Sequence, residues 1–373
     1  MNYTTYGNTG LNVSKLGYGV MRLPMDGDNV DREAGVAMLR RAYDLGVNAF
    51  DSHHFYLKGQ SESTLGEALG DLDRSTFVIQ TKHQMWSPLE EGESYRGDLE
   101  KSLQALRTDY VDTYLMHSLS WEWFEQRREA FFGDILKAKE EGLVRHIGLS
   151  SHDNVENVNR LIDTGLFECL LIQYNYANLM YEPCIAHAKE KGMGVSVMGP
   201  VGGGRLVSPN DVTREVSAEN HPVALALKFV WSNPNVDIAF SGMGSVEQVE
   251  QNVAFAEAAG ELTDSESARL REEAEKRKKL ADLFCTGCNY CMPCPKDVQV
   301  PQHFQALIWK RVYGIDQRTQ HIYDTLKARD KGALRCVACG QCLEKCPQHI
   351  DIPKQLKEVI AEFDPESTNT KAP

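Results

Sequence analysis

The chain has 373 residues, 42% of them hydrophobic and 25% charged, which excludes a largely disordered or fibrous protein. The net charge is −13; residues 281–373 hold 12 Lys and Arg against 11 Asp and Glu, so the first 280 residues carry −14. An acidic region without a basic stripe argues against a nucleic-acid partner. No apolar run reaches the roughly 18 residues of a membrane helix. No secretion signal opens the chain, so we expect a cytoplasmic protein without a membrane partner.

Short apolar runs alternate with amphipathic stretches between residues 16 and 258. The runs are Leu16–Met21, Val47–Phe50, Phe77–Gln80, Val111–Met116, Val144–Leu149, Leu170–Gln173, Gly194–Met198 and Val236–Phe240. The clearest helical patterns cover Arg32–Leu45, Tyr95–Leu106 and Trp123–Glu141. Eight strand–helix repeats in about 250 residues predict an α/β fold, a (β/α)8 TIM barrel.

The positions of glycines near the ends of these runs help to distinguish a barrel from an open sheet. The segment 5–10 reads as a hairpin that closes the barrel bottom. An open doubly wound sheet would place a third glycine after Gly17 and Gly19, and none follows. The run Gly202–Gly204 after the seventh strand suits a phosphate-contacting loop, or a flexible surface loop.

Ionisable residues stand at three successive strand ends. Asp51 ends the second strand, Lys82 follows the third, His117 follows the fourth, and Tyr56 lies five residues past Asp51. In a parallel barrel the carboxyl ends of the strands meet at one mouth, where chemistry takes place. We therefore expect these four side chains to form a catalytic site.

These residues lie in segments that resemble the aldo-keto reductase superfamily. The likeness covers about residues 1–260 and rests on Asn48–Asp51, Tyr56, Ser61–Glu62, Leu65–Gly66, Thr81–Lys82, Asp109–His117 and Gln173–Asn175. It implies an NAD(P)-dependent oxidoreductase acting on a small carbonyl or alcohol. Hydride delivery to a carbonyl places negative charge on oxygen, which Tyr56 would protonate. Lys82 would favour loss of the Tyr56 proton, Asp51 would hold Lys82, and His117 would orient the carbonyl.

The resemblance also assigns cofactor contacts. Ser150 and Gln173 match residues that hold the nicotinamide carboxamide, Ser151 stands where many relatives have Asn, and Met198 takes the position that stacks on the ring. The segment Ser241–Ser245 with Gln248 falls where many relatives bind the adenosine 2′-phosphate through cations, and none stands there. This absence favours NADH slightly over NADPH. The remaining expected contacts are Gly202, Arg205, Ser241, Gln251 and Asn252.

Two adjacent histidines, His53 and His54, separate Asp51 from Tyr56. Small residues are commoner in relatives at these positions. The histidines could be solvated loop residues, contact substrate or, less readily, bind a metal. Trp86, Trp121 and Trp123 in nearby loops could line an aromatic or sugar-sized pocket, or pack as lids, so the substrate is not readable.

Eight of the ten cysteines lie in the last quarter of the chain. Without a secretion signal, such clustering indicates metal ligation rather than disulfides, whereas the isolated Cys169 and Cys184 read as buried thiols. The eight cysteines form two motifs, the first with Cys285, Cys288, Cys291 and Cys294 and the second with Cys336, Cys339, Cys342 and Cys346. The second motif matches the cysteine spacing of bacterial ferredoxins, and the first is one residue shorter before its fourth cysteine.

By the ferredoxin logic the fourth cysteine of each motif ligates the other cluster. The first 4Fe-4S cluster would then take Cys346, and the second would take Cys294. Helical patterns over Gln302–Tyr313 and Gln317–Ala328 favour an α-helical ferredoxin-like domain. Structural zinc, or one cluster with spare thiols, is the alternative.

We therefore expect a barrel over residues 1–262, a connecting helix over 263–280, an iron–sulfur domain over 281–365 and a disordered tail over 366–373. The two clusters could exchange electrons with a redox partner protein, or serve a structural role. A barrel that holds a nucleotide without turnover is the other alternative.

Overall fold

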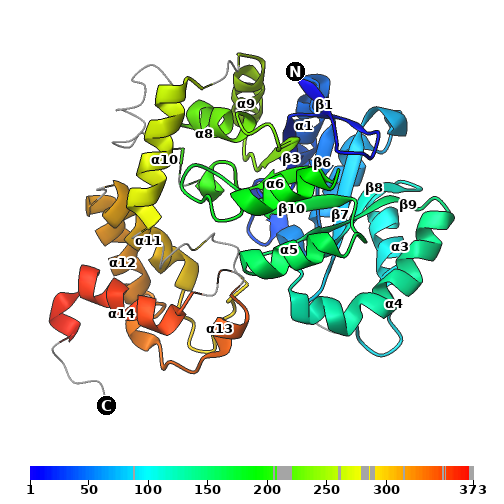
Figure 1. Ribbon diagram of the computed structural model, residues 1–373. Coiled ribbons are helices and arrows are strands. Elements are labelled where there is room, and N and C mark those ends of the chain that lie inside the picture. Colours follow the sequence, from blue (N-terminus) through cyan, green and yellow to red (C-terminus); the bar gives the residue numbers. More distant parts are fainter. Residues whose placement is uncertain are drawn as a thin grey trace. The chain divides into compact units, whose positions relative to one another are not determined.

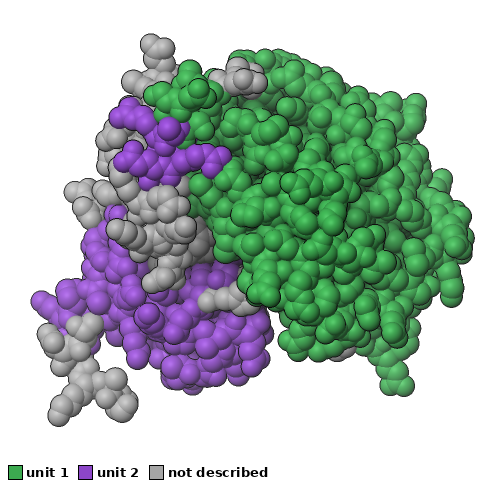
Figure 2. Space-filling model, viewed as in Figure 1, with its two compact units in different colours: residues 1–201, 219–267 green, residues 202–218, 268–373 purple. Residues whose placement is uncertain are grey.

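The computed structural model describes residues 1–86, 89–204, 206–207, 221–258, 262–278, 285, 290–313, 316–346, 348 and 350–368. The chain divides into two compact units (Figure 2). Residues 1–201 and 219–267 form unit 1, and residues 202–218 and 268–373 form unit 2. None of the described helices is long and apolar enough to cross a membrane.

Unit 1 is a closed barrel of eight parallel strands (Figure 1). In order around the barrel the strands are β10 (Cys169–Gln173), β11 (Gly194–Met198), β12 (Ile238–Ser241), β3 (Leu16–Gly19), β6 (Ala49–Asp51), β7 (Val78–Gln84), β8 (Val111–His117) and β9 (Val144–Ser150). The predicted TIM barrel is thus confirmed, and the open-sheet alternative is wrong. These strands are largely buried, as expected when helices cover the outside of a parallel sheet.

Helices follow the strands, and several of them begin at polar caps. They are α1 (Arg32–Asp44), α2 (Ser61–Leu69), α3 (Tyr95–Leu106), α4 (Trp121–Glu140), α5 (Val155–Asp163), α6 (Glu182–Glu190), α8 (Pro222–Trp231) and α9 (Val246–Ala258). The Ser120 side chain accepts a hydrogen bond from the Trp123 backbone, so α4 begins two residues before the predicted Trp123. The predicted bounds of α3 are those of the structure.

The start of the chain closes the barrel bottom. Strands β1 (Tyr3–Thr5) and β2 (Asn12–Ser14) pair antiparallel, as the hairpin prediction requires. Tyr6 is buried in one apolar cluster with Val13, Ala49 and Val78, at the amino ends of the barrel strands. A second short hairpin joins β4 (Met25–Asp26) to β5 (Asn29–Val30).

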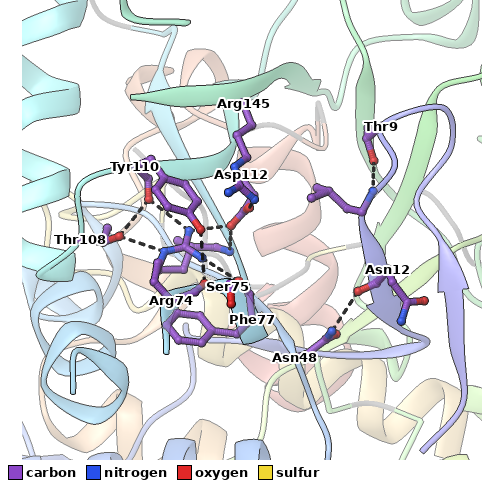
Figure 3. A network of polar contacts seen from close by, with 12 residues as sticks. Thr9, Asn12, Asn48, Arg74, Ser75, Phe77, Thr108, Tyr110, Asp112 and Arg145 are labelled. Atoms are coloured by element: carbon purple, nitrogen blue, oxygen red, sulfur yellow. Dashed lines mark hydrogen bonds and ion pairs between the residues drawn. The ribbon is translucent and has the colours of Figure 1, made fainter. Parts of the chain in front are cut away.

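A polar network braces the same end of the barrel (Figure 3). Asp112 on β8 is almost fully buried and forms ion pairs of 2.6 Å with Arg74 and 3.0 Å with Arg145. Both guanidinium groups also lie over the Tyr110 ring, at 4.1 and 4.0 Å from its centroid. This site lies away from the carboxyl ends of the strands, so the network serves stability.

Unit 2 is helical in its described part. Its elements are η3 (Gly202–Gly204), α10 (Asp264–Lys278), which begins in unit 1, α11 (Val300–Tyr313), α12 (Asp316–Ala328), η5 (Ala333–Arg335), α13 (Gln341–Glu344), α14 (Ile352–Phe363) and η6 (Pro365–Thr368). Its core packs Phe304, Leu307, Tyr323 and Leu356 together with the partly buried cysteines. The predicted helical ferredoxin layout agrees with this arrangement. Helix η6 lies in the segment expected to be disordered, and residues 369–373 lie outside the described part.

Candidate active site and cysteine site

The four predicted catalytic residues meet at the carboxyl end of the barrel. The Lys82 ammonium lies 2.6 Å from the Asp51 carboxylate and 5.0 Å from the centroid of the Tyr56 ring. The Tyr56 and His117 rings face each other edge to face, with centroids 6.0 Å apart. Strand β6 ends at Asp51, β8 ends at His117, and β7 carries Lys82 between them.

The Lys82–Asp51 ion pair is shielded from water. Lys82 is fully buried and also donates a hydrogen bond of 2.7 Å to the Ser52 carbonyl. Burial lowers the pKa of Lys82, and the Asp51 carboxylate opposes that shift. Gln80 donates to the same Asp51 oxygen at 2.7 Å and accepts from Thr113 at 3.1 Å. Asp51 is therefore held in place by two donors.

Backbone strain follows directly after Tyr56. Leu57 and Lys58 both adopt left-handed conformations, with φ of 54° and 57°, within the short helix η1 (Tyr56–Gly59). Residues other than glycine adopt this left-handed backbone conformation at a cost in free energy. The Tyr56 amide donates a 3.0 Å hydrogen bond to the His53 carbonyl, which helps to fix the strained turn.

The His117 side chain is held neutral at neutral pH. Burial, and then the Lys82 charge, keep the pKa of His117 well below its ordinary value. A neutral imidazole offers one N–H donor and one acceptor. His117 can therefore donate to a carbonyl oxygen without adding a charge.

The histidines before Tyr56 are not solvated loop residues. His53 is fully buried, with its ring centroid 4.4 Å from that of His117 and 5.2 Å from that of Tyr56. His54 is partly buried, and burial lowers the pKa values of both. Neither histidine belongs to a group of side chains, among the described residues, that could hold a metal ion. His53 therefore packs directly against two members of the candidate site.

A further buried histidine, His83, escaped the sequence analysis. Its ring lies 6.0 Å from His54 and 4.8 Å from Tyr95, measured between centroids, and its Nδ1 lies 3.0 Å from the Asp98 carboxylate. As the strand neighbour of Lys82, His83 points to the opposite side of β7, where Tyr95 and Asp98 belong to α3.

The residues expected to bind nicotinamide differ in whether their side chains keep a hydrogen-bonding group without a protein partner. Gln173 is buried, and its side-chain oxygen has no hydrogen-bond partner among the described residues. Ser150 instead accepts from the Ser118 amide at 2.9 Å. Ser151 donates to the Leu119 carbonyl at 2.6 Å and accepts from Asp153 at 3.1 Å. Gln173 thus retains an acceptor, whereas the Ser151 hydroxyl already bonds the backbone on both sides.

Met198 and the segment after β12 lie near the same mouth. Met198 ends β11 and pairs in register with Gln173. The Asn252 amide donates to the Ser241 hydroxyl at 3.1 Å, and both residues are buried, while Gln251 is exposed. Gly202 is buried and belongs to unit 2, and Arg205 lies outside the described residues.

The structure also brings a cation to the segment after β12. The Arg22 side chain lies against Gly242, where an added Cβ would sit 2.6 Å from its Cγ atom. Arg22 is exposed and makes no ion pair with another described residue. The pairing of β12 with β3 accounts for this proximity, because residues beyond Gly19 and beyond Ser241 leave adjacent strands. Strand order was the one signal that could have revealed it.

In unit 2 the fourth cysteine of the shorter first motif lies close to the cysteines of the second motif. Cys294 lines one pocket together with Cys336, Cys339 and Cys342, and Cys291 also borders it. Four thiols around one pocket fit a 4Fe-4S cluster, whose irons are held by cysteine thiolates. Cys285, Cys291 and Cys346 pack against the same core, and Cys288 lies outside the described residues. Cys294 thus lies with three cysteines of the second motif, and the crossed ligand sets stay a prediction.

Comparison with known proteins decides the family. Residues 15–275 match the model of the aldo/keto reductase family, and residues 284–351 match that of a 4Fe-4S dicluster domain. The chain belongs to the aldo/keto reductase family. L-galactose dehydrogenase of Arabidopsis thaliana is 29% identical over 72% of this chain and 90% of its own length. NADH-specific methylglyoxal reductase of Escherichia coli is 24% identical, over 72% and 97% respectively.

Solved structures share the barrel. Aldo-keto reductase AKR11C1 from Bacillus halodurans, in its holo form, matches with a TM-score of 0.63 at 24% identity, covering 73% of this chain and 96% of its own. An aldo-keto reductase from Klebsiella pneumoniae, solved in complex with NADPH, matches with a TM-score of 0.62 at 24% identity, covering 74% and 96%. At this identity the likeness shows the fold. The chain is thus an aldo/keto reductase-family oxidoreductase with a 4Fe-4S domain.

Proposed function

We propose that this reductase transfers hydride between NAD(P) and a carbonyl or alcohol carbon, with Tyr56 as the general acid or base. The observation that carries the proposal is the buried Lys82–Asp51 ion pair beneath the Tyr56 ring, next to a neutral His117. The nicotinamide supplies the hydride. The protein's part is to hold the carbonyl, exclude water and supply the proton.

Each side chain has a separable task. The Lys82 ammonium stabilises the tyrosinate that remains after Tyr56 gives up its proton, because opposite charges attract strongly in a buried site. Asp51 keeps Lys82 charged and oriented. His117 donates to the carbonyl oxygen, where charge develops during hydride transfer. In the direction of alcohol oxidation the same tyrosinate accepts the proton.

The test is the replacement Tyr56→Phe. Screening carbonyls and alcohols with both nicotinamides under anaerobic conditions first identifies a substrate. We then expect kcat to fall by about 10²- to 10⁴-fold, the usual contribution of general acid–base catalysis. Tyr43→Phe is the matched control, because the Tyr43 hydroxyl bonds Thr76 on the barrel's outside. Unchanged turnover in Tyr56→Phe would exclude the role proposed for that tyrosine, and would leave nucleotide binding as the barrel's function.

Gln173 supports the nicotinamide end of this proposal. Its unpartnered, buried amide oxygen can accept a hydrogen bond from the NH₂ of the nicotinamide carboxamide. Met198 beside it can pack on the ring through its polarizable thioether. Ser150 and Ser151 then act mainly by holding the loop after β8, through their bonds to Ser118 and Leu119.

Arg22 shifts the expected cofactor preference toward NADPH. The aliphatic part of the Arg22 side chain lies against Gly242, so its guanidinium is a candidate partner for a 2′-phosphate bound at the Ser241–Ser245 segment, which itself offers no cation. We expect Arg22→Ala to raise KM for NADPH about tenfold, the cost of a charge-assisted contact of roughly 1.4 kcal/mol, and to leave KM for NADH within twofold. Arg107→Ala, at an exposed position after α3, is the control. Equal effects on both nucleotides would remove Arg22 from phosphate recognition.

We also propose that unit 2 holds two 4Fe-4S clusters. One would take Cys294, Cys336, Cys339 and Cys342, as the shared pocket supports. The other would take Cys285, Cys288, Cys291 and Cys346. The clusters would supply one-electron chemistry, for which the barrel residues have no equivalent.

A further inference from the structure

The loop that carries the second cysteine motif has an exposed apolar surface. Val337 is 60% exposed, and Leu334 and Leu343 are 46% and 39% exposed. Ten large hydrophobic side chains are exposed among the described residues of the whole chain, and these three fall within one stretch of ten residues. Such a concentration of apolar surface indicates an interaction site rather than scattered exposure.

The same loop leads directly to a cysteine pocket. Val337 and the exposed Cys339 both line the pocket that Cys294, Cys336 and Cys342 share. Ala338 and Gly340 adopt left-handed conformations, with φ of 50° and 81°, so the backbone turns sharply on either side of Cys339. The ligand Cys339 therefore lies at the surface, beside the apolar residue Val337.

The charged side chains that line this pocket are Lys296 and Lys345, and no acidic residue lines it. Both lysines are exposed, and neither makes an ion pair within the part of the chain that the structure describes. Two unpaired cations beside an apolar patch present a surface that is complementary to an acidic one. Charges of this kind at a rim mainly raise the rate of association.

We propose that this surface, defined by Val337, Cys339, Lys296 and Lys345, docks an acidic protein that carries a one-electron redox group. The inference rests on the proposed cluster at Cys294, Cys336, Cys339 and Cys342. Electron-transfer encounters bury small interfaces, so a patch of this size with a cationic rim suffices for one. One electron leaves the reduced partner and enters the cluster, and no bond or proton moves.

The experiment uses the full chain, purified anaerobically, with an acidic flavodoxin in its fully reduced form as the probe. Stopped-flow absorbance follows the flavodoxin as it loses one electron, at several salt concentrations. We expect the wild-type rate to fall as salt rises, and Lys345→Glu and Lys296→Glu each to slow it about threefold to tenfold at low salt. Val337→Ser should slow it about threefold without changing the salt dependence.

Lys354→Glu is the matched control. Lys354 is exposed on α14, and 100° per residue places it on the side of the helix away from the pocket-lining Ile352 and Leu356. Flavodoxin should reduce the Lys354→Glu variant at the wild-type rate. Photoreduced 5-deazariboflavin, an uncharged reductant, should reduce every variant at the wild-type rate, because it needs no docking surface.

Three results would overturn the proposal. Lys345→Glu and Lys296→Glu could both react with flavodoxin at the wild-type rate, or Lys354→Glu could be slowed equally. The two variants could also be slowed by the same factor with 5-deazariboflavin, which would mean that the lysines tune the reduction potential instead. Failure of the cluster assignment itself looks different, because the wild-type chain would then lack iron and sulfide and neither reductant would be oxidised.

Discussion

A buried histidine beside Lys82 on β7 links the stability of this protein to pH. Burial lowers the pKa of His83 to about 4, from an ordinary value of about 6.5, although Asp98 partly opposes the shift. The folded state therefore contains a neutral imidazole that the unfolded chain would protonate first as pH falls. The contribution of His83 to stability is complete above pH 6.5 and is lost as pH falls toward 4.

We expect the free energy of unfolding to fall by up to about 3 kcal/mol per such histidine between pH 6.5 and 4. His83→Gln removes this titration and should flatten the dependence on pH. Urea unfolding followed by tryptophan fluorescence measures it, because four of the five tryptophans lie in unit 1. His321→Gln, at an exposed position on α12, should keep the wild-type slope. An identical slope in His83→Gln would contradict the expectation.

At the residue scale the sequence predicted which side chains would meet but not all of their surroundings. Asp51, Lys82 and His117 could be placed together because each stands at a strand end, and strand ends converge in a barrel. The contact of Arg22 with Gly242 was missed, because it joins positions 220 residues apart and follows only from the closure of β12 against β3. The burial of His53 depends on rings from several loops, which a linear pattern does not encode.

At the scale of elements, polar strand ends explain where the predicted bounds fall short. Strand β7 runs to Gln84, four residues beyond the apolar run that ended at Gln80. Thr81, Lys82 and His83 are polar and yet almost fully buried, so hydrophobicity alone ends the strand too early. The same residues carry the candidate site, and a functional site is where local sequence preference and structure are expected to disagree.

The packing of α2 on α3 depends on the absence of a side chain at Gly66. A Cβ there would lie 2.4 Å from the Ala105 carbonyl oxygen and 2.6 Å from the Leu106 carbonyl carbon. Gly66→Ala must push the two helices apart, and we expect a loss of about 1–3 kcal/mol of stability. Gly133 on α4 has no atom within 4 Å of an added Cβ. Gly133→Ala should therefore gain about 0.5–1 kcal/mol from helix propensity.

Thermal unfolding of the two variants tests this difference. The melting temperature should fall in Gly66→Ala and rise in Gly133→Ala, relative to the wild-type chain. Shifts of the same sign in both variants would show that helix propensity, rather than the close contact of α2 with α3, governs position 66.

At the scale of the whole molecule, the two units depend on different sources of stability. Unit 1 buries an extensive apolar core between strands and helices, whereas the core of unit 2 is small and packs against its own cysteines. The approximate division into a barrel and a cysteine-rich region could be predicted from the clustering of the thiols. The grouping of Gly202 with unit 2, away from the strand it follows, could not.

We expect the anaerobically purified chain to contain about eight iron and eight sulfide per molecule, as two 4Fe-4S clusters require. Removing iron with a chelator should abolish one calorimetric transition, that of unit 2, and leave the barrel transition in place, because metal ligation contributes directly to folding. A metal count of zinc without sulfide would contradict the cluster assignment. A simultaneous loss of both transitions would show that the units do not unfold independently.

The pairing of β12 with β3 determines how much of this protein must be synthesised before it can bind nucleotide. Strand β3, the first of the barrel, can complete its pairing only after β12, the last, has been synthesised. The Met1 amino group likewise forms an ion pair of 3.0 Å with Glu257, near the end of the barrel sequence. Asp51, Tyr56, Lys82 and His117 leave the ribosome early, but the proposed cofactor site beside Arg22 and Gly242 forms only after about 250 residues have emerged. A ribosome-bound fragment that ends before β12 should therefore carry the complete set of reactive side chains and still fail to retain nucleotide.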